Sequence, residues 1–415
     1  MNSILNDLSQ ALYGKPSNGL WMDALLVEFK GKSDTEIVVA TTSFVKKTVS
    51  LKADNVTYYV LPDSPPLCYN ENKKGNVAAW KELIDVEKPD LIQVWGTEFT
   101  HGLCCLRAAE GIPSVVYMQG YLGSIARYYQ AGIPVSELKK TVTLRDFIKR
   151  DGILSQQKKY YRAAKKEKET LKLAGAVISE NEWCDDNIRA VVPEIKTYKC
   201  PLSINKVFSE SIWSVERADR HSIISNASGY TIKGLHILLR AVALIKRRFP
   251  DVKLYVPGDP VVSDGSLLWS LRKRGYTKYI EKLIGELGIA DNIVWLGRLT
   301  QEELAGEYAK RHVFAMPSAI ENHSSSLKEA MAVGMPCVSS YVGGIPEYVD
   351  NGRNGLLYRF EEYEVLAAKI ESVFDSDTLA TSLSENARAD MKTLHGKIDY
   401  YEKITSIYRE MLCEK

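Results

Sequence analysis

Two glutamates, Glu321 and Glu329, flank a polar run and have seven residues between them. Behind this run, apolar residues recur at the spacing of one helix face, which predicts a helix. Serines are favoured at helix N-caps, so the helix is expected to begin within 324–326. Glu321 is then expected in the loop before the helix, and Glu329 inside it.

Such a site suits a nucleotide that carries a sugar on its diphosphate. The N–H groups and the positive end of a helix N-terminus favour a diphosphate. One carboxylate can accept two hydrogen bonds from the vicinal diol of a ribose, and a second can do the same for a sugar ring. The residues expected around the donor are His323, Ser324, Ser325, Ser326 and Leu327. The alternative is an ordinary capped helix with a glutamate on its solvated face.

The order of motifs that begins at Glu321 is specific. It continues as EAMAVGMP (329–336), CVSS (337–340), GGIPE (343–347) and NGRNGLLY (351–358). This order resembles the retaining glycosyltransferases of the GT-B fold, in particular family 4. The resemblance implies an α/β protein with two Rossmann-like doubly wound domains that face each other across a cleft. It also implies transfer of a sugar from a nucleotide diphosphate sugar with retention of the anomeric configuration.

The resemblance assigns roles to three side chains. It places Glu321 on the transferred sugar and Glu329 on the nucleotide. Lys233 lies at the end of the Gly-containing loop 228–234, where a predicted helix begins. In this position the ammonium is expected to stabilise the charge that develops on the leaving diphosphate. A solvated lysine at the start of a helix is the alternative.

The donor loops depart from the family in one respect. Relatives carry an arginine five residues before the lysine, where this chain has Ser228, followed by Gly229. Gly229 is still expected beside the donor, and Arg298 is the candidate substitute for the arginine. The base is expected at Gly297 and Arg298, largely through backbone groups, so the choice between UDP and GDP stays open.

Four residues of the first half are expected on the acceptor or sugar side. The Asn18-Gly19 loop should approach the donor phosphates, although no convincing strand precedes it. We therefore expect the first sheet to lack its usual first strand, and a strand to be coded upstream of Met1. Gln119 stands where many relatives have a histidine that points at the sugar, and an amide cannot shuttle a proton. His101 follows another predicted strand, where a structural role is the alternative.

No metal and no cofactor are expected besides the donor substrate. The triplet Asp375-Ser376-Asp377 lies between two predicted helices, where a helix cap is the better interpretation. The diphosphate charge is expected to be met by Lys233 and by helix dipoles. A G-x-G-x-x-G after the first strand is absent, which argues against a dinucleotide oxidoreductase.

Length and composition agree with a two-domain α/β protein. The chain has 415 residues, a formal net charge of +2 and seven cysteines, which include no C-x-x-C pair. The cysteine pattern argues against a zinc site or a disulfide framework and favours a reducing cytosol. The N-terminus has no apolar signal-peptide core, and no stretch is long and apolar enough to span a bilayer.

Short apolar runs alternate with helical patterns, which predicts parallel sheets with crossover helices. We expect an N-terminal, acceptor-binding domain over residues 1–200 and a nucleotide-sugar-binding domain over 201–389. Residues 390–415 are expected to form a helix that crosses back to the first domain. Ligands of open α/β sheets bind beyond the carboxyl ends of the strands, so the reaction is expected in the cleft.

One segment, residues 139–172, is strongly basic, with twelve lysines and arginines against four acids. A solvated helix with salt-bridged faces is one interpretation. The other is a surface that meets anionic lipid head groups or a lipid diphosphate acceptor. Nucleic acid is not expected, because no binding module accompanies the charge.

The sequence thus predicts a retaining, metal-independent glycosyltransferase. Its acceptor would be a sugar or a lipid-linked oligosaccharide, in bacterial capsular, exopolysaccharide or lipopolysaccharide assembly on the inner face of the cell membrane. Two alternatives stay open. One is a non-catalytic GT-B subunit that binds a partner or a glycan, and the other is a GT-B epimerase that acts on a UDP-sugar.

Overall fold

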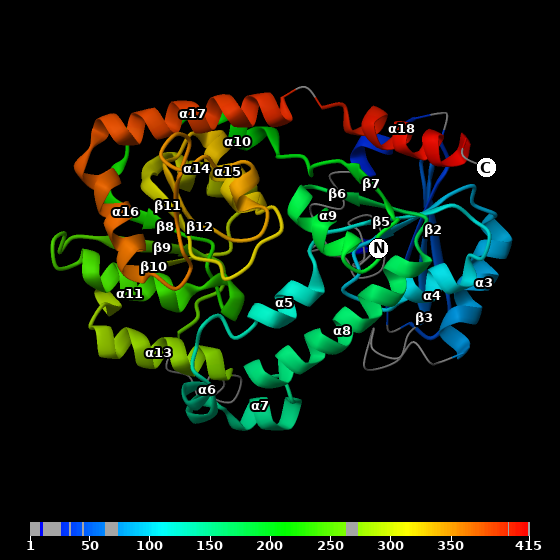
Figure 1. The fold of residues 1–415 in the computed structure, drawn as a ribbon, viewed down its shortest axis with the longest axis horizontal. Helices are drawn as coiled ribbons and strands as arrows, with labels where there is room; N and C mark the ends of the chain where they lie inside the picture. Colours follow the sequence, from blue (N-terminus) through cyan, green and yellow to red (C-terminus); the bar gives the residue numbers. More distant parts are fainter. Residues whose placement is uncertain are drawn as a thin grey trace. The chain divides into compact units, whose positions relative to one another are not determined.

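The computed structural model divides the chain into two packed units, drawn in Figure 1. Unit 1 comprises residues 1–123, 161–203 and 398–415, and unit 2 comprises residues 124–160 and 204–397. The structure describes residues 9–10, 26–32, 35–43, 45–62, 74–262, 273–396 and 398–413. Asn18, Gly19 and the residues on which the missing-strand prediction rests lie outside these ranges. Each unit is described by itself.

Unit 2 is built on a six-stranded sheet. Its order is β10 (Ile293–Gly297), β9 (Lys253–Pro257), β8 (Asp219–Ile224), β11 (Arg311–Met316), β12 (Cys337–Ser340) and β13 (Leu356–Tyr358). All five pairings are parallel. Strands β11 and β12 are buried along their whole length and β8 over its last three residues, as expected for a parallel sheet that is covered by helices.

Helices cover this sheet in two groups. The first contains α11 (Leu235–Ile245), α13 (Gly275–Leu287) and α16 (Tyr363–Asp375). The second contains α10 (Lys206–Glu210), α14 (Gln301–Lys310), α15 (Ser325–Val333) and α17 (Asp377–His395). In Figure 1, α11 and α13 lie below the strands, and α14 and α15 lie above them.

The strand order of unit 2 reverses between β8 and β11. The chain winds outward from β8 to β10, and then returns to lay β11 on the other side of β8. In doubly wound sheets ligands bind at this reversal, beyond the carboxyl ends of the two strands. The loops that leave β8 and β11 carry Lys233 and Glu321 respectively. The topology therefore brings these predicted residues to one edge of the sheet.

Residues 124–160, which the sequence analysis placed in the N-terminal domain, pack with unit 2. This segment contains most of α5 (Leu122–Tyr128), all of α6 (Val135–Thr141) and α7 (Leu144–Lys149), and the start of α8 (Ile153–Leu173). Helix α6 packs along α13. Glu137 of α6 forms ion pairs with Lys140 and with Lys282 of α13, which lower the pKa of its carboxyl to about 2.

Unit 1 contains two sheets. A parallel sheet has the order β4 (Ile92–Trp95), β5 (Ser114–Tyr117), β6 (Ala176–Ser179) and β7 (Lys196–Lys199). A smaller sheet has the order β1 (Ile37–Ser43), β3 (Val56–Pro62) and β2 (Val49–Ala53), in which β1 and β3 are parallel. Within the described ranges, β1 pairs with β3 and β4 with β5, so each has one edge without a described partner. The predicted loss of a first strand stays a prediction.

The helices of unit 1 are α3 (Lys74–Glu87), α4 (His101–Ala108), the rest of α8, α9 (Glu182–Arg189) and α18 (Tyr400–Cys413). Helix α18 presents Tyr401, Ile404 and Ile407 to a core that contains Phe29 and Tyr117. It begins at Tyr400, whereas residues 390–395 end α17. None of the described helices combines the length and the apolar character that a membrane span needs.

Candidate active site

Lys233 is fixed by a glycine that permits close backbone contact. It ends the short 3-10 helix η1 (Thr231–Lys233), and Gly234 after it has a positive φ of 69°. A Cβ atom at Gly234 would lie 1.7 Å from the carbonyl oxygen of Pro317. The Ala319 N–H donates to the Ile232 carbonyl at 2.7 Å. The loops behind β8 and β11 therefore hold each other, and only glycine fits between them.

Glu321 is fixed by a second glycine in the same way. Gly343, in the turn after β12, has a φ of 53°, and a Cβ there would lie 1.7 Å from the Glu321 carbonyl oxygen. The next N–H, that of Gly344, donates to the Asn322 carbonyl at 3.2 Å. The two glycines thus clamp the Glu321 loop from both sides.

The side chains of Lys233 and Glu321 meet. The Lys233 ammonium donates to the Glu321 carboxylate at 2.6 Å, and the Ser318 hydroxyl donates to the same oxygen at 2.7 Å. The Glu321 side chain is largely buried, whereas that of Lys233 is about a third exposed. The pair thus places a cation with access to solvent next to a largely buried carboxylate. This arrangement can stabilise an anionic leaving group beside a sugar hydroxyl.

Helix α15 begins at the polar run, as the sequence predicts. Ser324 is its N-cap, and the Ser324 hydroxyl accepts from the Leu327 N–H at 3.4 Å. Ser325 is exposed and Leu327 is buried. The N–H groups of Ser325 and Ser326 lie in the first turn, where the helix itself offers no acceptor. The capped end therefore points donors and the positive end of the helix dipole at the loop that carries Glu321.

Glu329 is held differently from Glu321. It lies on α15 and is half-buried. Removal from water raises the pKa of its carboxyl to about 7, and the charge of Lys328 opposes this shift. Among the described residues, none donates a hydrogen bond that stabilises the Glu329 carboxylate. Tyr308 lies near it, and the Tyr308 hydroxyl accepts from the Asn226 side chain at 2.8 Å. Glu329 is therefore desolvated and open to diol donors.

His323 and Lys328 support this loop from inside. Lys328 is almost fully buried, and its ammonium lies 3.2 Å from Nδ1 of His323. The His323 ring meets Tyr348 edge to face at 4.6 Å. His323 was predicted at the donor, whereas Lys328 was not predicted at all. A lysine inside an amphipathic helix gives no sequence signal of burial.

An aromatic cluster braces the loop before Lys233. The hydroxyls of Tyr230 and Tyr160 lie 2.7 Å apart, and the rings of Tyr129 and Tyr160 lie 4.9 Å apart. Close by, His236 hydrogen-bonds the Ala131 carbonyl through Nε2 at 2.8 Å and the Tyr276 hydroxyl through Nδ1 at 3.1 Å. Burial lowers the pKa of His236 to about 4, so the ring is neutral. Residues from 124–160 thus support the donor loop, a role that the sequence analysis did not assign.

Gly297 and Arg298 lie at the end of β10. Gly297 has a φ of 71°, and its carbonyl accepts from the Gly258 N–H at 2.7 Å. The Arg298 guanidinium forms two hydrogen bonds with the Asp259 carboxylate, at 2.9 and 2.7 Å, in an exposed pair. The ion pair with Asp259 thus competes with the predicted phosphate contact of Arg298. Gly229 lies in the loop after β8, with Val261 nearby.

The triplet Asp375-Ser376-Asp377 lies between α16 and α17. Ser376 is the N-cap of α17, and its hydroxyl accepts from the Leu379 N–H at 3.1 Å. Asp375 pairs with Arg248, and Asp377 pairs with Arg220 through two hydrogen bonds. Both carboxylates thus have partners within the fold.

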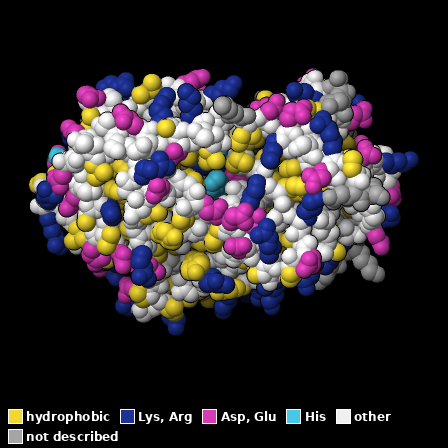
Figure 2. Space-filling view, turned by 45° about the horizontal axis from the view of Figure 1, so that its top comes forward, with side chains coloured by type: hydrophobic (Ala, Val, Ile, Leu, Met, Phe, Trp, Pro, Cys, Tyr) yellow, Lys and Arg dark blue, Asp and Glu magenta, His cyan; other side chains and the backbone are white. Residues whose placement is uncertain are grey.

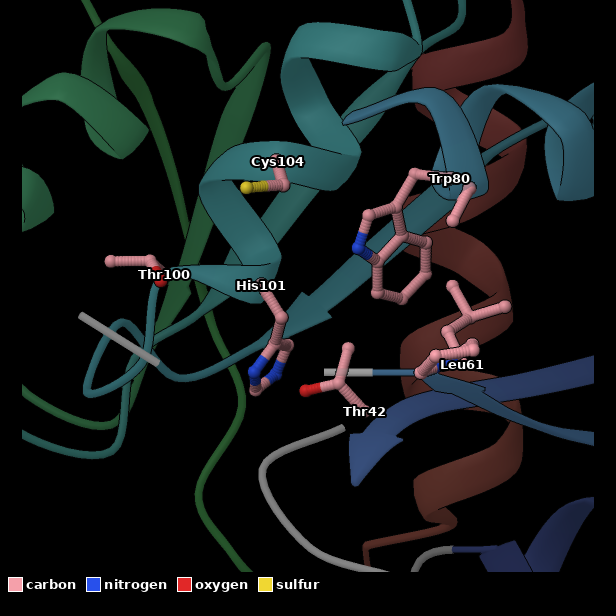
Figure 3. Close-up of a pocket in the computed structure, with 8 residues that line it drawn as sticks. Thr42, Leu61, Trp80, Thr100, His101 and Cys104 are labelled. Atoms are coloured by element: carbon pink, nitrogen blue, oxygen red, sulfur yellow. The ribbon is translucent and has the colours of Figure 1, made fainter. Parts of the chain in front are cut away.

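Gln119 and His101 lie in unit 1, so their approach to the donor residues stays a prediction. Gln119 is half-buried in the loop after β5. His101 is the first residue of α4 and is buried. Figure 3 shows it in a small pocket, where its ring faces Thr42 and lies across from Trp80. The pocket lies at the carboxyl ends of β1 and β3, the edge where open α/β sheets bind ligands.

Glu167 of α8 joins the two loops that carry these residues. Its carboxylate is fully buried and accepts from the Thr97 hydroxyl at 2.7 Å. It also accepts from the N–H groups of Leu122 at 3.1 Å and Gly123 at 3.3 Å. Burial raises the pKa of the carboxyl to about 8, while these hydrogen bonds act in the opposite direction. Ala164 and Leu171 are buried on the same helix, so the burial of Glu167 follows from packing, which the sequence does not show.

The second half of the chain is similar in sequence to known glycosyltransferases. Residues 211–390 match the family model described as Glycosyl transferases group 1. The D-inositol 3-phosphate glycosyltransferase of Corynebacterium urealyticum is 31% identical over 156 residues, which cover 38% of this chain and 35% of that protein. The matched region spans less than half the length of such curated relatives.

Two solved structures share the fold over almost the whole chain. Sucrose-phosphate synthase from Thermosynechococcus elongatus is 19% identical, with a TM-score of 0.71 and coverage of 96% of this chain and 94% of that one. HepE of Anabaena in complex with UDP is 18% identical, with a TM-score of 0.63 and coverage of 96% and 97%.

Proposed function

Since residues 211–390 match the model of the glycosyl transferases group 1 family and the chain has the GT-B fold, we propose that this protein is a retaining glycosyltransferase. The observation that carries the proposal is the Lys233–Glu321 pair at the reversal point of the unit 2 sheet. Close to it in the chain lie a capped helix N-terminus and the desolvated carboxylate of Glu329, to which no described residue donates. A diphosphate between a ribose and a sugar matches these three features.

Each part of the donor has a proposed binding group. Glu329 accepts hydrogen bonds from the ribose diol, and the first turn of α15 binds the diphosphate. Lys233 neutralises charge on the leaving phosphate, and Glu321 accepts from a hydroxyl of the transferred sugar. The base binds at Gly297 and Arg298. UDP is the first nucleotide to test, because HepE, which shares the fold, was solved with UDP.

The proposed reaction retains the configuration at the anomeric carbon. The bond from this carbon to the diphosphate oxygen breaks, and the acceptor hydroxyl bonds to the same face of the carbon. The departing phosphate oxygen takes the hydroxyl proton, so the reaction requires no protein base. This route accommodates Gln119, which cannot carry a proton. Lys233 and the α15 dipole meet the diphosphate charge without a metal ion.

We also propose a lipid-linked oligosaccharide as acceptor, in the assembly of a bacterial surface polysaccharide. The basic segment 139–172 would then hold the protein at the inner face of the cell membrane. Two of the four acids in this segment, Asp146 and Glu167, are buried, so its surface is more basic than its sequence suggests.

A panel of UDP- and GDP-sugars tests the proposal through released nucleotide, with and without a chelator. Wild-type protein is expected to release nucleotide from one donor, and activity that persists in the chelator supports a metal-independent reaction. A double variant, Lys233→Ala/Glu321→Ala, is expected to be inactive. Full activity of this variant would overturn the site assignment. A wild type that binds nucleotide but never turns over would favour the non-catalytic alternative, and a free epimerised UDP-sugar would favour the epimerase.

A further inference from the structure

Helix α7 turns its apolar face outward. Leu144, Phe147 and Ile148 follow the i, i+3, i+4 spacing of one helix face. Their exposed fractions are 71%, 77% and 66%, and Val142 just before the helix is also exposed. Such a face normally packs on a core, so the sequence alone suggests burial. The structure shows the reverse.

The polar face of α7 is the one that is anchored. Asp146 is buried and accepts from the N–H groups of Thr143 at 3.1 Å and Gly275 at 2.7 Å. The Thr143 hydroxyl donates to the Lys273 carbonyl at 2.9 Å. A Cβ atom at Gly275 would lie only 2.7 Å from the Asp146 carboxylate. These contacts fix the orientation of the helix, so the exposure of the apolar face is a property of the packed unit 2.

Exposed cations flank this apolar face along the chain. Lys139 lies on α6 before it, and Lys149 and Arg150 lie at its end. The acids nearby are neutralised, because Glu137 pairs with Lys140 and Lys282, and Asp151 pairs with Arg145. In the view of Figure 2, basic and acidic side chains are interspersed over the surface.

Bulky apolar side chains within a basic rim match the surface of an anionic bilayer. The side chains enter the boundary of head groups and acyl chains, and the lysines and arginines meet lipid phosphates. A second copy of this chain would bring the two basic rims together, which opposes its docking there. The charge therefore selects a lipid surface among the possible occupants.

We propose that α7 is a membrane-insertion element, with Leu144, Phe147 and Ile148 as the inserted side chains and residues 139–150 as the anionic-lipid contact. The inference rests on the membrane location proposed above and deepens it. It assigns membrane attachment to the apolar face of α7 as well as to the charge of residues 139–172.

Vesicle co-sedimentation of the full chain tests this assignment. Wild-type protein is expected to bind vesicles that contain phosphatidylglycerol. Phe147→Ser/Ile148→Ser is expected to bind them at least about tenfold more weakly, since each factor of ten corresponds to ~1.4 kcal/mol of lost burial. The matched control is Val86→Ser/Ile212→Ser, which removes two apolar side chains that are similarly exposed elsewhere, 72% and 54%. The control should bind like wild type. Equal binding by both double variants would overturn the proposal.

Insertion itself is measured with Phe147→Trp. Its added fluorescence is expected to shift to the blue and to be quenched by brominated phosphatidylglycerol, whereas Val86→Trp should show neither effect. Light scattering without lipid gives the remaining outcome. A wild-type dimer that Phe147→Ser/Ile148→Ser converts to a monomer would assign this face to a second copy and overturn the proposal. Nucleotide release is assayed separately, so vesicle binding without sugar transfer would overturn the proposed function alone.

Discussion

Glu329 in unit 2 and Glu167 in unit 1 are both withdrawn from water, and burial raises the pKa of each, to about 7 and about 8. Their partners differ. Glu167 accepts three hydrogen bonds from groups of its own unit, whereas the Glu329 carboxylate has no described donor. The same desolvation therefore serves two purposes. The Glu167 carboxylate already accepts hydrogen bonds from the fold, whereas the Glu329 carboxylate can still accept hydrogen bonds from a ligand.

The largest effect is expected from Lys233→Ala, which removes the cation that we propose to lie next to the donor diphosphate. The turnover number should fall about 10²–10³-fold, the scale of a lost electrostatic contact to a leaving group. Nucleotide release under saturating donor measures it. The melting temperature should stay close to that of wild type, because the lysine is partly exposed. A melting temperature that fell together with turnover would assign the ion pair to stability.

Glu167→Ala should lower stability and leave nucleotide binding almost unchanged. Three donors lose their acceptor inside unit 1, and a buried donor without a partner costs ~1–3 kcal/mol. We expect the free energy of unfolding to fall by about 2–4 kcal/mol in denaturant titration. The UDP dissociation constant should stay within about twofold of wild type, since the nucleotide site belongs to unit 2. A loss of UDP affinity as large as that of Glu329→Ala would contradict the contrast.

Glu329 should make nucleotide binding sensitive to pH. Its diol-binding form is the carboxylate, and its pKa is raised to about 7. Affinity for UDP should therefore be complete above pH 8 and should fall about tenfold for each pH unit below 7, as the ionised fraction falls. Calorimetry at pH 6 and pH 8 measures this difference. Glu329→Gln should bind UDP weakly at both pH values. Because this variant lacks the carboxylate, any pH dependence that it keeps would come from the titration of UDP itself.

The smallest effect is expected from Arg298→Ala. Its pair with Asp259 is exposed to solvent and therefore contributes little to stability. If Arg298 replaces the arginine that the family has at the position of Ser228, UDP affinity should fall by severalfold and recover in Arg298→Lys. Unchanged affinity in Arg298→Ala would leave the diphosphate to Lys233 and α15.

The sequence predicted the fold class correctly, and the reason lies in the strands. Apolar runs mark the strands that became β8 to β12, because parallel strands covered on both faces are continuously hydrophobic. The GT-B fold is confirmed by the solved structures. The three-residue β13 lies inside the motif NGRNGLLY and is too short to show a period. Strand β7, with no fully buried residue, has no apolar run to detect.

Of the candidate site, the sequence located the loops but not the partners of their residues. Ser324 at the N-cap and Glu321 in the loop follow from local pattern, which is a property of neighbouring residues. The contact of Lys233 with Glu321 joins residues 88 apart and depends on the strand order. The burial of Lys328 and Glu167 depends on packing in the same way. The roles of Gln119, His101, Asn18 and Gly19 stay predictions.

Unit 1 is made from three segments that lie far apart in the sequence, residues 1–123, 161–203 and 398–415, and this has a consequence for synthesis. Residues 1–123 leave the ribosome long before α18, which completes their core with Tyr401, Ile404 and Ile407. At ~5–20 residues per second, α18 follows the first strands by roughly 20–70 seconds. Unit 2 can close earlier, once α17 has emerged. Unit 1 thus begins to emerge before unit 2 but is completed after it, and its core keeps an open apolar face until α18 arrives.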